Sequence, residues 1–154
     1  MPNVTPFLTY NDKAEEAAKL YTSLFNDSSI TKTTYYPEGS PMPTGSVMTV
    51  EFELNKQKYV ALNGGPHFAF TEGFSLSVSC TSQAEIDELW DKLTANGGQP
   101  GQCGWLKDQF GVSWQITPAN MGQLLQSNDP ARGQRKMAAM LQMHKIDIAT
   151  LEQA

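Results

Sequence analysis

The sequence predicts an α+β domain in which a β-α-β-β-β unit occurs twice in tandem and forms a curved mixed sheet. Two amphipathic helices begin about 70 residues apart, and each follows one strand-like segment and precedes three more. The 154 residues, 40% hydrophobic and 18% charged, are typical of a globular chain with its own core. We therefore predict a single domain over 1–154, with modules 1–66 and 67–118 and C-terminal helices over 119–154.

The two helices are the most strongly marked elements. Apolar residues recur on one helical face over 12–25 and over 82–96, and two glycines follow the second segment. Each segment starts with a residue pair of capping-box spacing. These pairs are Asp12 with Glu15, and Ser82 with Glu85.

Strand-like segments surround both helices. Those of the first copy are expected at 4–10, 30–36, 46–54 and 58–63, and those of the second at 74–80, 99–103, 105–107 and 112–117. After Pro118, a methionine-rich stretch predicts one or two helices that pack on the domain or on a partner. This stretch makes a homodimer the expected assembly.

Alternation along the strands predicts one apolar and one polar sheet face. In 74–80 and 112–117 the apolar residues alternate with Ser, Thr and Gln, and in 58–63 we expect Val60 and Leu62 to face the helix. A neutral polar face with aromatics suits a ligand cavity, although a solvent-facing sheet is the alternative. The predicted ligand-binding residues are Thr5, Phe7, Thr9, Tyr59, Asn63, His67, Ser75, Ser77, Trp105, Lys107, Ser113 and Gln115.

Composition argues against several classes of function. A net charge of -5 and a pI near 4.9 oppose nucleic-acid binding, and the basic residues near the C-terminus are expected to form a solvated helix face. The first residues lack a secretory pattern, and no apolar run is long enough to cross a membrane. Two cysteines, Cys80 and Cys103, predict buried inert thiols in a reducing cytoplasm.

Several longer stretches resemble a known family. They lie at 5–10 (TPFLTY), 14–21 (AEEAAKLY), 61–68 (ALNGGPHF), 103–116 (CGWLKDQFGVSWQI) and 140–148 (MLQMHKIDI). They are similar to the PhnB-like proteins, or 3-demethylubiquinone-9 3-methyltransferase-like domains, of the glyoxalase/bleomycin resistance (vicinal oxygen chelate) superfamily. The resemblance implies paired β-α-β-β-β modules and frequently a homodimer.

The resemblance also implies where a superfamily metal would be held. Enzymes of the superfamily use His, Gln and Glu side chains, and the corresponding positions here are Thr5, Ala61, Gly73 and Gln115. Only Gln115 offers a good ligand, whereas metal sites ordinarily need three or more. No metal or other cofactor is therefore expected, although a displaced metal site stays open.

Other groups give weaker indications of chemistry. His67 beside a Gly-Gly-Pro turn and Gln115 are the catalytic candidates, and Trp105, Lys107 and Asp108 could form a pocket rim. No Gly-x-Gly-x-x-Gly turn follows a strand, which argues against methyltransferase activity.

Three functions follow, in order of preference. The first is binding of an unidentified small molecule in the concave sheet pocket without a metal. The second is a metal-dependent lyase or isomerase with a displaced site, in which Gln115 acts with His67 or Asn63. The third is a DNA-associated regulatory protein, which the acidic balance opposes.

Overall fold

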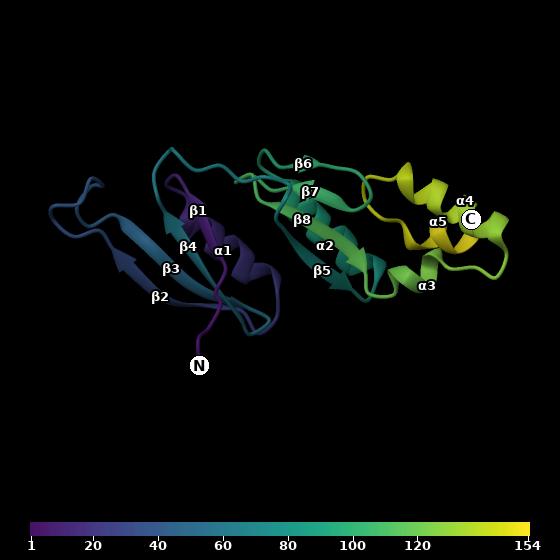
Figure 1. Ribbon diagram of the computed structural model, residues 1–154, viewed down its shortest axis with the longest axis horizontal. Helices are drawn as coiled ribbons and strands as arrows, with labels where there is room; N and C mark the ends of the chain where they lie inside the picture. The colour runs from purple at the N-terminus through teal and green to yellow at the C-terminus, as the bar shows by residue number, and fades with distance from the viewer. The chain divides into compact units, whose positions relative to one another are not determined.

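A computed structural model describes residues 1–154, which divide into two compact units, Met1–Ala69 and Phe70–Ala154. Each unit contains one four-stranded mixed sheet with a helix against one face (Figure 1). The predicted tandem of β-α-β-β-β units is confirmed. The strands form two separately hydrogen-bonded sheets, one in each unit.

The first unit has strand order β1-β4-β3-β2. Strands β1 and β4 run parallel, and the other neighbours are antiparallel. Its elements are β1 (Phe7–Tyr10), α1 (Ala14–Leu24), β2 (Ser29–Tyr35), β3 (Val47–Leu54) and β4 (Gln57–Asn63).

Helix α1 packs on this sheet through small and aromatic side chains. Ala17, Ala18 and Tyr21 are fully buried. The ring centroids of Tyr21 and Phe52 lie 6.3 Å apart, and Phe52 stacks on Tyr59 at 5.4 Å. The two alanines let the helix approach the sheet closely, and the three rings fill the space that remains.

The start of α1 differs from the prediction. The Asp12–Glu15 capping box does not form, because Lys13 occupies the N-cap position and gives no side-chain cap. Instead, Oδ1 of Asn63 at the end of β4 accepts a hydrogen bond from the backbone N of Ala14 at 2.8 Å. The amide nitrogen of Asn63 also donates to the Val47 carbonyl at 3.1 Å. A side chain from a neighbouring strand thus accepts the hydrogen bond of a backbone N–H group at the start of the helix.

The second unit has strand order β5-β8-β7-β6, again with one parallel pair, β5 and β8. The predicted cap of α2 is confirmed, since Ser82 Oγ accepts from the backbone N of Glu85 at 3.2 Å. The Glu85 carboxylate accepts from the backbone N of Thr81 at 2.7 Å. The elements are β5 (Ser75–Cys80), α2 (Gln83–Thr94), β6 (Gln99–Pro100), β7 (Trp105–Lys107) and β8 (Ser113–Pro118).

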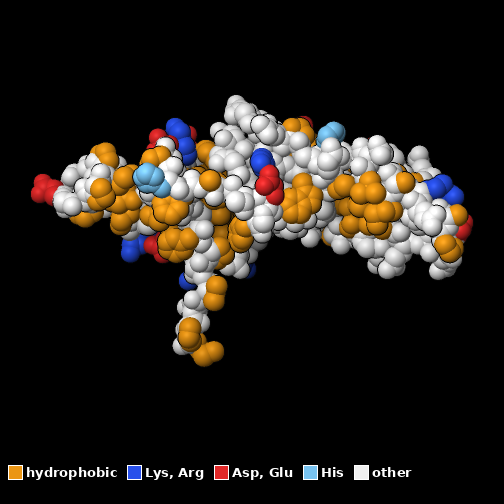
Figure 2. All heavy atoms as spheres, turned by 45° about the horizontal axis from the view of Figure 1, so that its top comes forward, with side chains coloured by type: hydrophobic (Ala, Val, Ile, Leu, Met, Phe, Trp, Pro, Cys, Tyr) orange, Lys and Arg blue, Asp and Glu red, His pale blue; other side chains and the backbone are white.

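Three helices follow, where one or two were predicted: α3 (Met121–Leu125), α4 (Pro130–Leu141) and α5 (Ile148–Gln153). Lys136 of α4 is buried, and its ammonium donates to the Leu124 carbonyl at 2.9 Å. Apolar side chains gather on the surface over the C-terminal helices (Figure 2), where Met137 and Leu141 of α4 are exposed. No helix has the length and apolar character that crossing a membrane requires.

The C-terminal segment is tied to the second sheet by main-chain hydrogen bonds. The backbone N of Cys103 donates to the Met143 carbonyl at 2.9 Å, and that of Gly104 donates to the His144 carbonyl at 2.8 Å. Ile146 beside them is fully buried. The turn between β6 and β7 is therefore held in place by the chain that follows α4.

Candidate functional site

Strand pairing in the second unit places a set of predicted site residues on one sheet face. Lys107 is the cross-strand partner of Ser113, and Trp105 that of Gln115. Ser75 and Ser77 pair in parallel register with the same two residues of β8. Because paired residues point to the same side, these six lie together on the face opposite α2. The predicted polar face of β5 and β8 is confirmed, and Trp105 and Lys107, predicted at a rim, lie on that same face.

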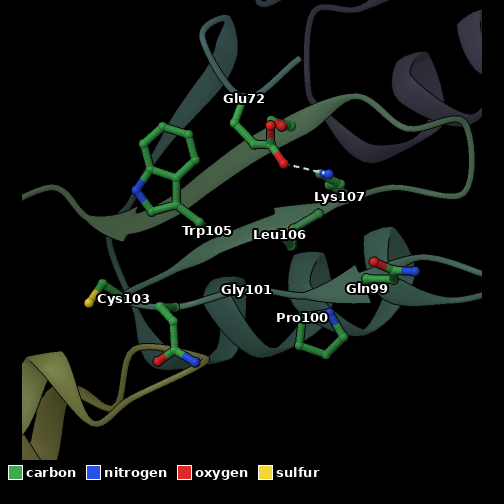
Figure 3. A pocket seen from close by; sticks show the side chains of 10 residues that line it. Glu72, Gln99, Pro100, Gly101, Cys103, Trp105, Leu106 and Lys107 are labelled. Atoms are coloured by element: carbon green, nitrogen blue, oxygen red, sulfur yellow. Dashed lines mark ion pairs between the residues drawn. The ribbon is translucent and has the colours of Figure 1, made fainter. Parts of the chain in front are cut away.

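A cavity of about 460 Å³ opens on this face beside β7 (Figure 3). This volume is within the range of small-molecule sites. Trp105 gives it an apolar wall on this face, and Lys107 and Glu72 add an ion pair with a nitrogen–oxygen distance of 2.5 Å. The lining residues are Glu72, Gln99, Pro100, Gly101, Gln102, Cys103, Trp105, Leu106, Lys107 and Ser113.

Ser113 is the most informative residue in this lining. It is only 2% exposed, and its hydroxyl is the single buried side-chain polar atom of residues 1–154 without a hydrogen-bond partner. A buried hydroxyl left in this state costs about 1–3 kcal/mol. Its neighbour Gln115 is already engaged, because its amide nitrogen donates to Ser75 Oγ at 2.9 Å. The Ser113 hydroxyl is therefore a buried group beside the cavity whose hydrogen-bonding capacity is unused within the chain.

The Glu72–Lys107 pair carries the charge of the cavity. The hydrogen bond from Lys107 lowers the pKa of Glu72, so its carboxylate is ionised at neutral pH. The side chains of Lys107 and Glu72 remain 43% and 64% exposed. A pair this accessible contributes little to stability and can separate at small cost.

Asp108, expected at the rim, instead organises the turn between β7 and β8. It is 3% exposed. Its Oδ1 accepts from the backbone N of Phe110 at 2.9 Å and of Val112 at 3.0 Å, and its Oδ2 accepts from the Trp114 indole N at 2.9 Å. This network fixes where β8 starts, and hence where Ser113 lies.

In the first unit the register of β4 overturns one prediction. Phe7 pairs with Val60 and Thr9 with Leu62, so Val60 and Leu62 lie on the face away from α1. The candidates Tyr59 and Asn63 lie on the α1 side, where Tyr59 stacks on Phe52 and Asn63 caps the helix. The prediction was wrong because residues 59–62 are all aromatic or aliphatic, so the sequence pattern did not show which of them face the helix. The parallel register with β1 fixes which side each residue of β4 faces.

The first unit has its own surface hollow of about 850 Å³, which Thr5, Phe7 and Tyr59 help to line. Burial raises the pKa of Tyr59. Its other walls carry both acidic and basic side chains, and they include no buried polar atom without a partner. The hollow thus offers less defined recognition than the cavity beside β7.

The remaining candidates are dispersed. His67 is exposed in the connection after β4. Thr9 is half-buried near Gly64, where an added Cβ would meet its methyl group at 2.8 Å. His67 and Gln115, the two catalytic candidates, belong to different compact units.

The residues at the superfamily metal positions do not fit a metal. Ala61 is fully buried on the α1 side and Gly73 has no side chain, so of the four positions only Thr5 and Gln115 carry an oxygen that could bind a metal. The neighbours of Ala61 on the open face, Val60 and Leu62, carry no ligating atom. No three His, Cys, Asp or Glu side chains of residues 1–154 come together as metal ligands.

The cysteines occupy two different environments. Burial, with a smaller contribution from Glu85, raises the pKa of Cys80 to about 11, so its thiol stays protonated at neutral pH. Cys103 is half-buried at the cavity, and its sulfur lies 3.5 Å from the Met140 carbonyl oxygen.

Three basic residues near the C-terminus are engaged within the chain, whereas Arg135 is exposed. Arg132 donates to the carbonyls of Glu152 and Ala154, and Lys145 pairs with Asp87 at 2.8 Å. With Lys136 buried as described, little of this charge is arranged as a free basic surface.

The sequence analysis missed most of the cavity wall, namely Glu72, Gln99, Pro100, Gly101, Gln102, Cys103 and Leu106. The weak strand predicted at 99–103 was the available signal, because a strand beside β7 must contribute side chains to the same face. Glu72 lies in a connection, where the sequence gives no such rule.

Comparison with known proteins places the fold. Residues 2–117 match the family described as 3-demethylubiquinone-9 3-methyltransferase. A putative protein of that description from Bacillus cereus, PhnB, is 37% identical, with a TM-score of 0.70 over 77% of this chain and 100% of its own. A Pseudomonas aeruginosa protein is 21% identical, with a TM-score of 0.61 over 77% and 98%. No curated protein matches the chain.

More distant structures share the fold alone. The fosfomycin resistance protein FosX from Listeria monocytogenes is 15% identical, with a TM-score of 0.56 over 82% of this chain and 98% of its own. The helices α3 to α5 lie beyond the residues that match the family. The chain therefore belongs to the PhnB-like, or 3-demethylubiquinone-9 3-methyltransferase, family, and its two β-α-β-β-β units have the glyoxalase-type fold.

Proposed function

We propose that this protein binds a small organic molecule in the cavity beside β7, without a metal ion. The observation that carries the proposal is the Ser113 hydroxyl, which is buried at the cavity with no hydrogen-bond partner. A folded protein usually satisfies such a group, and a ligand oxygen or nitrogen can do so here. Trp105 supplies an apolar surface beside it.

The metal-dependent alternative has less support. It needs at least three ligating side chains that converge on one point, whereas Ala61 and Gly73 at the superfamily positions have no ligating atom and only Thr5 and Gln115 remain. The DNA-associated alternative needs an open basic surface, whereas Arg132, Lys136 and Lys145 are engaged within the chain.

Fragment screening by amide NMR tests the proposal directly. Fragments should shift the Trp105 indole and the amides of Lys107 and Ser113, with the same affinity in EDTA as in added Zn²⁺ or Mn²⁺. Because binding stabilises the folded state, the same fragments should raise the melting temperature. Binding that requires a divalent metal, or that maps elsewhere for every fragment, would overturn it.

Ser113→Ala separates a binding role from a structural one. Removing an unsatisfied buried hydroxyl should leave the free energy of unfolding unchanged or raise it by about 1 kcal/mol. The same change should weaken polar fragments, because their partner is lost. Ser79→Ala, an exposed serine on the same sheet face, is the matched control and should change neither quantity.

A homodimer remains a prediction from the methionine-rich C-terminal helices, on which Met137 and Leu141 are exposed. Sedimentation equilibrium of the full chain measures it directly.

A further inference from the structure

Two side chains on β7 present different chemistry to the same cavity. Trp105 and Lys107 are two residues apart, so both project from the same face, roughly 6.6 Å apart along the strand. One offers a flat aromatic surface and the other an ammonium group. A ligand that contacts both must combine a flat apolar part with an acceptor or anion at that spacing.

Lys107 is the only basic residue that lines the cavity. Its cross-strand partners, Gln99 and Ser113, are neutral and polar, and both lie on the same face. The one anion against it is the carboxylate of Glu72, which points at the ammonium in Figure 3. Glu72 lies in the connection before β5, outside any helix or strand, and its side chain is 64% exposed. Replacing this carboxylate with another requires no rearrangement of the sheet.

We propose that the cavity takes a flat aromatic carboxylic acid, whose carboxylate replaces that of Glu72 on Lys107 while its ring lies against Trp105. This inference rests on the proposed function and names the ligand class for the same site. The ligand carboxylate would also lie within reach of the Ser113 hydroxyl, because Ser113 is the direct cross-strand partner of Lys107. Glu72 then acts as an internal competitor that holds the ammonium when no ligand is bound.

The charges favour a carboxylate over other acceptors. A phosphate ester carries up to two negative charges and is ordinarily held by several cationic or backbone donors, whereas this cavity has one cation. A neutral ligand would bind beside the existing ion pair and gain nothing from Lys107. A monoanion exchanges one carboxylate–ammonium pair for another, and the burial of its ring against Trp105 supplies the net gain.

Three probes with one ring system test the ligand class: 2-naphthoate, 2-naphthamide and 2-naphthyl phosphate. Each is titrated into the full chain by amide NMR, at low salt and at 150 mM salt, with the variants Glu72→Gln and Lys107→Met. The ion pair of Asp87 and Lys145 provides matched controls, Asp87→Asn and Lys145→Met, because it has similar exposure and does not line the cavity.

We expect 2-naphthoate to bind more tightly than 2-naphthamide. Glu72→Gln should tighten 2-naphthoate by about two- to fivefold, which is what the loss of an exposed ion-pair competitor allows. Lys107→Met should abolish the preference for the carboxylate and leave 2-naphthamide unchanged. Higher salt should weaken 2-naphthoate selectively. The control variants should leave all affinities as in the parent.

Different results mark failure of the ligand class and failure of the proposed function. If 2-naphthamide or 2-naphthyl phosphate binds in the cavity at least as tightly as 2-naphthoate, the carboxylate assignment is overturned and small-molecule binding stands. The same holds if Glu72→Gln does not tighten 2-naphthoate. If none of the probes and no screened fragment shifts the cavity amides, the proposed function fails, and this inference fails with it.

Discussion

Replacing Asp108 tests whether the turn between β7 and β8 depends on one buried carboxylate. In Asp108→Ala the backbone N of Val112 and the Trp114 indole N, both buried, lose their acceptor. Each unsatisfied buried donor costs about 1–3 kcal/mol, so the free energy of unfolding should fall by about 2–6 kcal/mol. The backbone N of Phe110 also loses its partner but is less buried, and it adds less.

Asp108→Asn divides this cost between the two carboxylate oxygens. The Asn oxygen can still accept from Phe110 and Val112, but its NH2 group then faces the indole N–H of Trp114. A loss of about 1–3 kcal/mol is expected from that one contact. In a Trp114→Phe background the indole donor is absent. There Asp108→Asn should reduce the free energy of unfolding by at least about 1 kcal/mol less than it does in the parent.

Urea denaturation followed by circular dichroism measures the parent and all of these variants, since it does not depend on the tryptophan that is replaced. Asp91→Asn, an exposed position on α2, is the matched control and should stay within about 0.5 kcal/mol of the parent. The reasoning is refuted if Asp108→Asn is as stable as the parent, or if it costs the same in both backgrounds.

Three further changes test other parts of the structure. Asn63→Ala should lower the free energy of unfolding by about 2 kcal/mol in urea, because the start of α1 loses its cap, and an unchanged midpoint would contradict that role. Gly104→Ala should lower the melting temperature more than Gly39→Ala, since both have φ near +87° but only an added Cβ at Gly104 meets a backbone oxygen, at 2.8 Å. The raised pKa of Cys80 predicts that stability is full below pH 9 and falls toward pH 11, as the thiol ionises in the unfolded chain before it does in the folded one. Cys80→Ala should remove that part of the pH dependence. In the variant Cys103→Ser, in which Cys80 is the remaining cysteine, alkylation of Cys80 should stay slow until the pH approaches 11.

Local patterns were enough where alternation was clear and neighbouring elements supplied the partners. In β5 and β8 each apolar residue alternates with Ser, Thr or Gln, so the open face could be assigned before the fold was known. Ser82 and Glu85 form their cap within one helical turn, so the start of α2 followed from the sequence. The element order of both β-α-β-β-β units came from the same kind of local evidence.

Contacts between distant segments required the tertiary structure. Asn63 reads as an open-face ligand in the sequence, yet it caps α1 from 49 residues away, because β4 pairs in parallel with β1. Lys136 reads as a solvated charge, yet its ammonium is buried on the Leu124 carbonyl.

The sequence by itself determined the two modules and the polar face of β5 and β8, since both depend on the period of side chains along one element. Only the tertiary structure decided that Glu72 meets Lys107 and that the Ser113 hydroxyl is left without a partner beside a cavity. Hydrogen bonds and ion pairs across connections depend on register and loop path, and no local pattern encodes either.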